Sequence, residues 1–570
     1  MAGADELIEY IRTSVIGDRE VVDGPFGPRR VIYADYTASG RALSFIEDYV
    51  RDAVLPLYAN THTESSGTGR QTTRLREDAR AIIRRCVGAD AGHAVLFCGS
   101  GSTGAIDRLV NVLGLRIPSE MERRHDLSRH VAAAERPVVF VGPFEHHSNE
   151  LPWRESIADV VTIGEDGDGH VDQGQLAREL ARFADRPLRI GSFSAASNVT
   201  GIMSDTTAIT RLLHRHGALS FWDFAAAAPY IGIEMTPGGD PEAAKDAIFL
   251  SPHKMIGGPG TPGVLVARRE LFRNTVPAVP GGGTVAYVNP SEHRYLDDIE
   301  HREEGGTPAI VESIRAGLVF QLKEAVGVDT IREREASFIR RAIASWDANP
   351  NIEVLGNHSA ERLSIVSFVV RYGGGDDGRG RLLHHNFVVA VLNDLFGIQS
   401  RGGCSCAGPY GHRLLGIDID RSHEFEREIA RGCEGIKPGW VRVNFNYFID
   451  EDVFDYLLRA VHMVASEGWK LLPFYRFDPD SGLWRHRGGR AAPPMSLDDV
   501  NYRSGRMSYR HRPRHDGEGD LAVSLAAAAL VLAEAPGSLP EPMGLPSVSA
   551  DFEHLRWFPF PDEARAISSQ

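Results

Sequence analysis

Cysteine is scarce in this chain, with five residues among 570. So few thiols, odd in number, exclude the disulfide framework of a small secreted protein. Residues 1–17 contain acidic side chains and no apolar centre, which argues against a secretory signal. We therefore expect a cytoplasmic protein with reduced thiols.

Long apolar runs are also missing. The nearest is the alanine-rich stretch 521–536, which is shorter than the roughly 20 residues that a membrane-spanning helix needs. It predicts a helix packed on the rest of the protein, and we expect no membrane partner.

Basic residues are fewer than acidic ones: the sequence has 62 lysines and arginines and 77 aspartates and glutamates, which give a formal net charge of −15. A protein that binds nucleic acid normally carries a basic surface, so we expect no such partner. The arginine-rich segments 484–490 and 509–515 are interpreted as solvated surface.

Short, continuous apolar segments alternate with helical segments in the first half of the chain. Continuous apolar strands are typical of a parallel sheet buried on both faces, and the alternation with helices predicts an α/β domain over residues 31–305. Helices are predicted over 71–87 and 206–216. The predicted strands are 93–98, 136–142, 188–194, 219–224, 246–251 and 263–268.

The pattern changes after residue 305, and 570 residues exceed one compact core, so we expect further domains. Residues 306–470 predict a smaller α+β domain, with a long helical stretch, a glycine- and aspartate-rich loop after residue 372, and a cysteine-bearing loop near 404. Residues 1–30 are expected to pack with that domain. Residues 471–570 form an extension of unknown role, whose aromatic part, 471–486, is expected to pack on the main body.

Polar side chains follow several of the predicted strands. "FLSPHKM" (249–255) ends a strand in Ser251, His253 and Lys254. Earlier in the chain, a glycine- and hydroxyl-rich turn with Ser102 and Thr103 follows the predicted strand 93–98 and opens a helix. This arrangement suits an anion. Taken singly, each of these features has a structural explanation: a solvated lysine, or a tight turn.

Two more strand ends complete the set: "FWDF" ends in Asp223, and "PFEHH" carries His146 and His147. Ligands of open α/β sheets bind at the carboxyl ends of strands. An anion cradle, a carboxylate, an imidazole and a lysine at one sheet edge indicate pyridoxal 5′-phosphate, which needs a Schiff-base lysine, an acid at its ring nitrogen and a phosphate cradle.

Over roughly residues 30–465 these motifs resemble the class V aminotransferases, PLP-dependent transferases of fold type I, and especially the cysteine desulfurase and selenocysteine lyase branch. The resemblance implies catalytic roles for Lys254, as the Schiff-base lysine, and for His146, stacked on the cofactor ring, with His147 the less favoured choice. The cofactor-binding residues that it implies are Ser102, Thr103, His146, Asn198, Asp223, Ser251, His253, Lys254 and Thr307.

The same resemblance implies a homodimer, since "EEGGTPAIV" is similar to a segment that reaches the neighbouring subunit's phosphate, here through Thr307. It implies substrate contacts from Asn198, Arg401 and Arg442, the last through a guanidinium on the substrate carboxylate. One departure is Ala226, which stands where the family often has a glutamine that bonds the cofactor's O3′.

The turn "RGGCSC" holds Cys404 and Cys406. No second Cys/His pair lies nearby at zinc-finger spacing, so we expect no metal, and a disulfide across one residue is strained; two inert turn cysteines are the structural alternative. The spacing from Arg401 to Cys406 is similar to that of the desulfurase branch, and "RGGCSC" also resembles molybdenum cofactor sulfurases. Cys406 is then the nucleophile and Cys404 a possible second thiol.

These residues predict a PLP-dependent cysteine desulfurase that converts L-cysteine to L-alanine and leaves the sulfur as a persulfide on Cys406. A sulfur-acceptor protein or a thiol is a possible partner. The alternatives are an aminotransferase, β-lyase or epimerase of the same fold, or a catalytically idle sulfur-relay protein.

Overall fold

The computed structural model describes residues 2–61, 63–372, 380–489, 495–510 and 519–565. The glycine- and aspartate-rich loop expected after residue 372 lies outside these ranges over 373–379, as do the basic residues 511–515 and Arg490. Within the described ranges, no helix combines the length and apolar character needed to cross a membrane.

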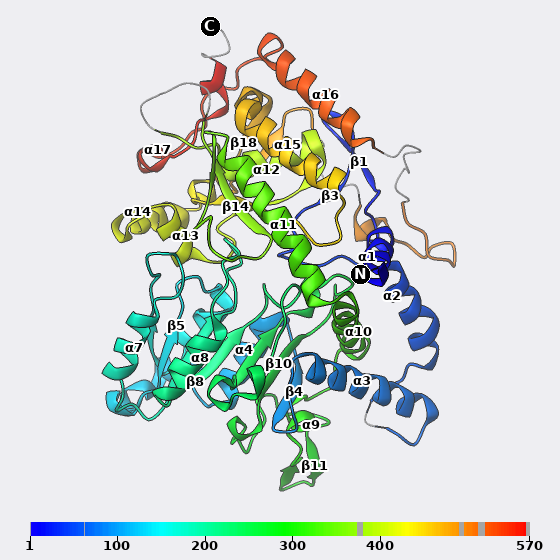
Figure 1. The fold of residues 1–570 in the computed structure, drawn as a ribbon, viewed down its shortest axis with the longest axis vertical. Coiled ribbons are helices and arrows are strands. Elements are labelled where there is room, and N and C mark those ends of the chain that lie inside the picture. The colour runs from blue at the N-terminus through cyan, green and yellow to red at the C-terminus, as the bar shows by residue number, and fades with distance from the viewer. Residues whose placement is uncertain (1, 62, 373–379, 490–494, 511–518, 566–570) are drawn as a thin grey trace.

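A seven-stranded sheet forms the centre of the large domain (Figure 1). β10 runs antiparallel to both its neighbours, β4 and β9, and the remaining neighbouring pairs are parallel. The carboxyl ends of the other six strands therefore meet at one edge. In spatial order the strands are β4 (His93–Cys98), β10 (Gly263–Arg268), β9 (Ala247–Leu250), β8 (Leu219–Asp223), β7 (Arg189–Ser194), β5 (Val138–Val141) and β6 (Asp159–Thr162).

Apart from the half-exposed edge strand β6, the sheet is buried on both faces, because its strands are mostly apolar. In β4, Val95 and Phe97 join one core cluster while Leu96 joins the other, as the alternation of side chains along a strand requires. One face packs against α3 (Gly67–Cys86), α7 (Gln173–Arg182), α8 (Thr206–Arg215) and α10 (Ile310–Val326), and the opposite face against α4 (Gly101–Val112) and α6 (Leu151–Arg154).

The small domain is built on a four-stranded antiparallel sheet in the order β13 (Ile352–Val354), β14 (Ile365–Val370), β17 (Trp440–Asn444), β16 (Arg401–Gly403). Helices α11 (Val328–Asp347), α12 (His385–Phe396) and α15 (Glu451–Glu467) share its core. β16 ends directly before Cys404 and pairs with β17 so that Arg401 lies opposite Arg442. The small sheet thus carries the cysteine turn.

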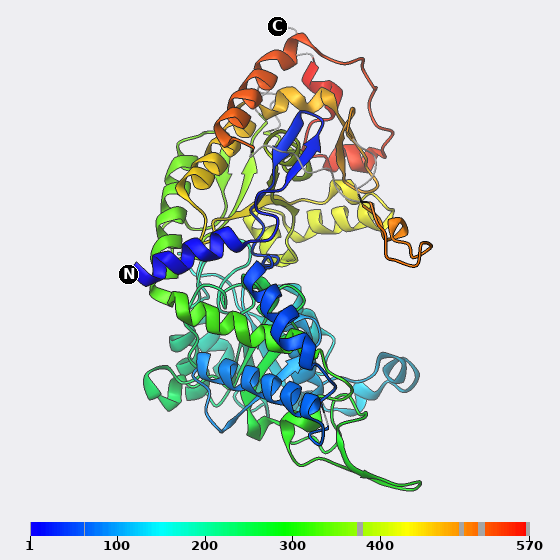
Figure 2. The same ribbon diagram turned by 90° about the vertical axis from the view of Figure 1, so that its right-hand side faces the viewer.

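The C-terminal extension packs on this small domain, as the aromatic residues of 471–486 predict. It contributes the hairpin β18 (Tyr475–Phe477) and β19 (Trp484–His486), then α16 (Leu521–Glu534) and α17 (Ala550–Leu555). The rings of Phe477 and Trp484 lie 4.9 Å apart in the same core as α12. Figure 2 shows the extension gathered around the small domain, away from the large sheet.

The first 30 residues divide between the two domains. α1 (Ala2–Ser14) buries Ile8 and Ile11 in a core cluster that both domains share, and Arg12 Nε donates to the Phe448 carbonyl of the small domain at 2.6 Å. The hairpin β1 (Val21–Gly24) and β2 (Gly27–Arg30) instead lies against α12, where the buried Arg29 Nε donates to the Leu395 carbonyl at 2.7 Å.

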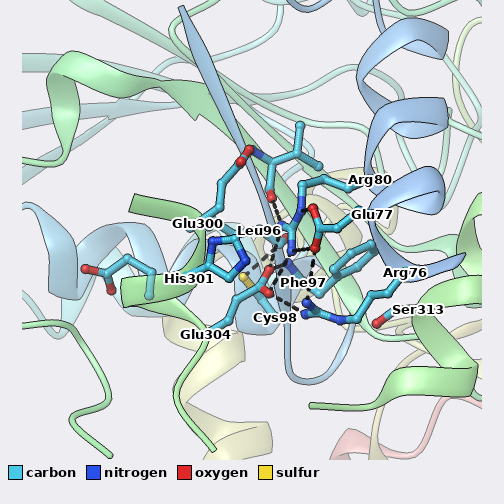
Figure 3. A network of polar contacts seen from close by, with 12 residues as sticks. Arg76, Glu77, Arg80, Leu96, Phe97, Cys98, Glu300, His301, Glu304 and Ser313 are labelled. Carbon is cyan, nitrogen blue, oxygen red and sulfur yellow. Dashed lines mark hydrogen bonds and ion pairs between the residues drawn. The ribbon is translucent and has the colours of Figure 1, made fainter. Parts of the chain in front are cut away.

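The edge strand β4 is closed by two buried carboxylates, Glu300 within α9 (Ile299–Glu303) and Glu304 directly after it, as Figure 3 shows. Glu304 accepts the Phe97 N–H at 2.7 Å and pairs with Arg80 at 2.9 Å and with Arg76. Burial alone raises the pKa of Glu304, but Arg80 and Arg76 outweigh it and lower the pKa to about 2. An unpaired strand edge is thereby satisfied, and the strand that leads to residues 99–103 is fixed.

We expect Glu304→Gln to lower the free energy of unfolding by about 3–5 kcal/mol, because it removes the buried counter-charge of two buried guanidinium groups and leaves them only the more exposed Glu77. Urea denaturation compares the variant with Glu77→Gln, which removes a more exposed carboxylate on Arg80 and should cost less than about 1 kcal/mol. Equal losses in the two variants would contradict this account.

The same carboxylate makes stability depend on pH. Because the folded pKa lies below the ordinary 4.5, its contribution is complete above that pH and is lost as the pH falls toward 2. Glu304→Gln should flatten this acid limb of the stability curve.

Candidate active site

One cavity of about 240 Å³ collects nearly all the residues singled out in the sequence. It opens at the carboxyl edge of the large sheet and is closed from the other side by the small domain. The predicted residues that line it are Ser102, Thr103, His146, Asn198, Asp223, Ser251, His253, Lys254, Arg401, Cys406 and Arg442. A larger hollow of about 850 Å³ lies between the β1–β2 hairpin and the extension and carries none of them.

Lys254 enters the cavity from the short 3₁₀ turn Pro252–Lys254 that follows β9. Burial lowers the pKa of its amine to about 8, Asp223 acts in the opposite direction, and Arg442 and Arg401 lower it further. With a pKa of about 8, roughly a tenth of this amine is neutral at pH 7, far more than for an ordinary lysine, and the neutral form acts as a nucleophile or a base.

Asp223 stands at the end of β8 with only 4% of its surface exposed. Its Oδ1 accepts the Ala225 N–H at 2.8 Å. Burial raises the pKa of Asp223, while the Ala225 N–H, Lys254 and the Ser102 hydroxyl oppose that rise. This buried carboxylate lacks a close cation among the described residues, so it is suited to hold a protonated group of a ligand.

The turn after β4 forms an anion cradle at the start of α4. Ser100, at the N-cap position, makes no side-chain capping bond, and the Ser102 N–H donates to Ser251 Oγ at 2.8 Å. Gly101 has φ +54°, and a Cβ there would lie 2.7 Å from the His253 ring, so only glycine fits. The helix N-terminus supplies a favourable field for an anion.

His146 lies on the loop after β5 in a neutral form. The Ser148 N–H donates to its Nδ1 at 3.1 Å, so that nitrogen carries no proton. Burial, followed by Lys254, lowers the pKa of His146 to about 3. Glu145 anchors the loop by accepting Ser194 Oγ–H at 2.6 Å, and the ring is therefore held as an uncharged flat surface on the cavity wall.

Arg442 is 2% exposed and is held at two points. One guanidinium nitrogen donates to the Asn198 carbonyl at 3.0 Å and another to Asp35 Oδ1 at 2.9 Å, while Nε is buried without a partner in the described part of the chain. Burial lowers the pKa of Arg442, opposed by Asp35. The side chain is rigid and retains donor capacity toward the cavity.

The cysteine turn reaches this cavity from the small domain. Ser405 and Cys406 both have positive φ, +51° and +56°, in a turn closed by Ala407 N–H to the Cys404 carbonyl at 3.1 Å. Two such residues in succession resemble a type I′ turn, and non-glycine residues there carry strain of about 1–3 kcal/mol each.

Three hydrogen bonds from the large domain hold the backbone of the turn. His147 donates its N–H to the Cys406 carbonyl at 2.8 Å and accepts the Gly408 N–H on Nε2 at 3.1 Å. Asn198 Nδ2 donates to the Ser405 carbonyl at 2.8 Å. Both cysteines of the turn are exposed; Cys406 lines the cavity, and Cys404 does not.

Thr307 lies apart from the cavity, with its hydroxyl 3.4 Å from Asn60 Nδ2. Sequence reasoning also missed three contributors. Asp35 had no recognisable motif, His147 was known only as the neighbour of His146, and Ser148, which lies 2.6 Å from Thr103 Oγ1, was one serine among many. Across the described residues, no cluster of three or more His, Cys, Asp or Glu side chains is arranged to hold a metal ion.

A mostly parallel seven-stranded sheet, a smaller α+β domain and a polar cavity between them define an α/β fold of the type I pyridoxal-enzyme class. The model of the aminotransferase class-V family matches residues 32–419, and the chain belongs to that family.

Individual relatives and a solved structure are similar to this chain. A probable cysteine desulfurase of Streptomyces coelicolor is 26% identical over 402 residues, 69% of this chain and 86% of the relative. A cysteine desulfurase of Dickeya dadantii is 27% identical, over 66% and 83%. Among solved structures, the apo cysteine desulfurase of Thermococcus onnurineus superposes with a TM-score of 0.60 at 22% identity, covering 76% of this chain and 94% of that one.

The burial of Lys254 predicts that its amine loses its proton at a lower pH than an ordinary lysine. In protein stripped of bound small molecules, acetylation of this amine should rise with pH around a midpoint of about 8, measured by mass mapping of the 249–268 peptide. Asp223→Asn removes the anionic charge that opposes deprotonation, so its midpoint should fall further. A wild-type midpoint near the ordinary 10.5 would contradict the described burial.

Proposed function

We propose that the cavity binds pyridoxal 5′-phosphate. The residues fit that group: the N-terminus of α4 with Ser102 and Thr103 suits its phosphate, and the buried Asp223 suits a protonated ring nitrogen. Asn198 Oδ1 is a buried acceptor with no partner in the described chain, on the wall where a ligand would lie. When bound, the cofactor supplies an electrophilic carbon for Lys254 and an electron sink for the substrate.

The flat faces of the cavity support the same assignment. His146, uncharged, suits stacking on an aromatic ring, and Ser251 and His253 border the cradle. Ala226 lines the cavity without a hydrogen-bond donor, so the amide of Asn198 is the side chain that we assign to the cofactor's O3′.

We propose further that the protein is a cysteine desulfurase, which transfers the sulfur of L-cysteine to Cys406 and releases L-alanine. One observation carries this proposal: a cysteine thiol, a lysine amine and a buried arginine line one cavity of about 240 Å³. The similarity to proteins named cysteine desulfurase over two thirds of the chain supports it.

Different residues of the chain bind the substrate and transfer its protons. Arg442 binds the substrate carboxylate through its guanidinium, with Arg401 opposite it on β16 adding positive charge. Lys254, neutral in part, removes the Cα proton and returns a proton to the product.

Sulfur transfer then needs Cys406 as a thiolate, the nucleophilic form of a cysteine. Its Sγ attacks the substrate sulfur, so an S–S bond forms and the substrate C–S bond breaks. The bonding pair remains on the substrate carbon, which takes up one proton to become the methyl group of alanine. The sulfur keeps its hydrogen as the Cys406 persulfide.

Cys404, exposed two residues away, is suited to pass sulfur onward to an acceptor protein or a small thiol. Thr307, exposed and outside the cavity, is assigned to the site of a second copy, in a homodimer. An aminotransferase, β-lyase or epimerase of the same fold would use Lys254 but leave Cys406 without a role, and an idle relay protein would leave Lys254 without one.

The cofactor proposal predicts a visible absorbance band in purified protein that shifts when L-cysteine is added, with alanine and sulfide released in the presence of a thiol. Lys254→Ala should abolish the band, because no amine remains to bond the cofactor. A band that shifts without alanine formation would move the function to another amino acid, and no band after added cofactor would overturn the site.

The nucleophile proposal predicts that Cys406→Ala lowers alanine formation by at least about 10³-fold, since removing a nucleophile abolishes its covalent step. The cofactor band and its shift should persist. The matched control is Cys404→Ala, two residues away, which should form the Cys406 persulfide at the wild-type rate and differ only in its onward transfer. Equal activity of the two variants would contradict the assignment.

A further inference from the structure

The strand that leads into the cysteine turn rests on the first turn of α12. A Cβ built on Gly402 would lie 2.6 Å from Asn386 Oδ1 and 3.1 Å from His385 Nδ1. No larger residue fits unless these side chains move. The position of β16, and with it of Cys404–Cys406, is therefore set by His385 and Asn386.

His385 is a buried, neutral spacer. It is 6% exposed, and burial lowers its pKa to about 4, opposed by the Lys437 carbonyl. Nδ1 lies 3.0 Å from Asn386 Oδ1, and Nε2 lies 3.3 Å from the Lys437 carbonyl oxygen. A neutral ring carries one N–H, so it donates a hydrogen bond to one of these two oxygens. The Nδ1 flank of the ring faces Gly402 on β16.

The C-terminal extension holds the ring from the other side. Trp557 stacks on His385 with centroids 5.8 Å apart and 24° between planes, and on His384 at 5.1 Å and 17°. Trp557 is itself anchored, since its Nε1 donates to the Ile436 carbonyl at 3.0 Å and its carbonyl accepts the Leu382 N–H at 3.0 Å.

A second contact from the extension reaches the same place. Asn386 Nδ2 donates to the Gly482 carbonyl, in the β18–β19 loop, at 2.8 Å. This bond fixes the amide so that its Oδ1 faces His385 and Gly402. Both contacts thus converge on the strand before Cys404, and both come from residues beyond the family match, which ends at 419.

We propose that the extension, through Trp557, positions the cysteine turn for sulfur transfer. Trp557 is a positioning residue: it holds His385 against Gly402, and β16 then delivers Cys406 to the cavity. This inference rests on the proposed desulfurase function. The strained backbone at Ser405 and Cys406 explains why such support is needed, because a turn with two positive φ values relaxes when its flanking strand is free.

Removal of the Trp557 ring should therefore slow sulfur transfer to Cys406 and leave cofactor binding intact. Without the Trp557 ring, Lys254, Asp223 and Arg442 keep their surroundings, since none of them contacts the extension in the hydrogen bonds and ion pairs of the described residues. Cofactor binding and the first response to L-cysteine should persist, whereas the attack by Cys406 should slow. A displacement of about 1 Å at a reacting atom costs on the order of 10²-fold in rate.

The test compares Trp557→Ala with Phe552→Ala in the full chain. Phe552 is a buried ring of the same extension that contacts Phe477, Phe558 and Phe560 and neither His384 nor His385. Both variants lose a large aromatic ring from one cluster, so a general loss of packing affects both. Trp557→Phe, which keeps a stacking ring, should restore transfer.

Two readouts are needed. Single-turnover persulfide on Cys406, followed by mass mapping, should fall about tenfold or more in Trp557→Ala relative to Phe552→Ala, with an unchanged cofactor spectrum. Hydrogen exchange of the 401–408 peptide, measured also without cofactor, should accelerate in Trp557→Ala alone. Equal transfer rates and equal exchange in the two variants would overturn the proposal.

The two proposals fail in different ways. If wild-type protein forms no persulfide and no alanine, the desulfurase function is wrong, while exchange in 401–408 still tests the packing path. If wild-type protein forms both and Trp557→Ala matches Phe552→Ala, only the positioning role is wrong.

Discussion

The structure depends on a hydrogen-bonded junction between two domains: the backbone of the cysteine turn is bound by the large domain. His147 holds the Cys406 carbonyl and the Gly408 N–H, and Asn198 holds the Ser405 carbonyl. The small domain supplies the thiol and the large sheet supplies the lysine, so neither can form the site alone. Asn198 serves both sides, since its own carbonyl also accepts from Arg442.

Electrostatics explains why this junction can be reactive. Burial raises the pKa of Asp223 and lowers that of Lys254, and each shift is limited by the charge of the other. Arg442 is paired with Asp35 and held by Asn198, so a second cation stays in the cavity without neutralising Asp223. Buried charged groups with shifted pKa values are typical of functional sites.

Much of this could be predicted from sequence. The continuous apolar runs 93–98 and 263–268 match β4 and β10 residue for residue, because strands buried on both faces leave an unmistakable pattern. The strand-end residues converge because parallel strands end at one edge. The short β6, with its half-exposed residues, left no such run and was missed.

The parts that could not be predicted depend on contacts between distant segments. The antiparallel direction of β10, the carboxylate of Glu304 on β4, the grip of His147 on the turn, and the stacking of Trp557 on His385 each join residues far apart in the chain. No local spacing encodes such pairs. Likewise, Asp35 beside Arg442 is visible only once residues 35 and 442 are brought together.

The most direct test of the account is the location of the transferred sulfur. After a single turnover of L-cysteine, followed by alkylation and peptide mapping, the account predicts one additional sulfur atom on Cys406 together with an equal amount of alanine. Alanine formed with no sulfur on Cys406, or sulfur found first on Cys404, would contradict it.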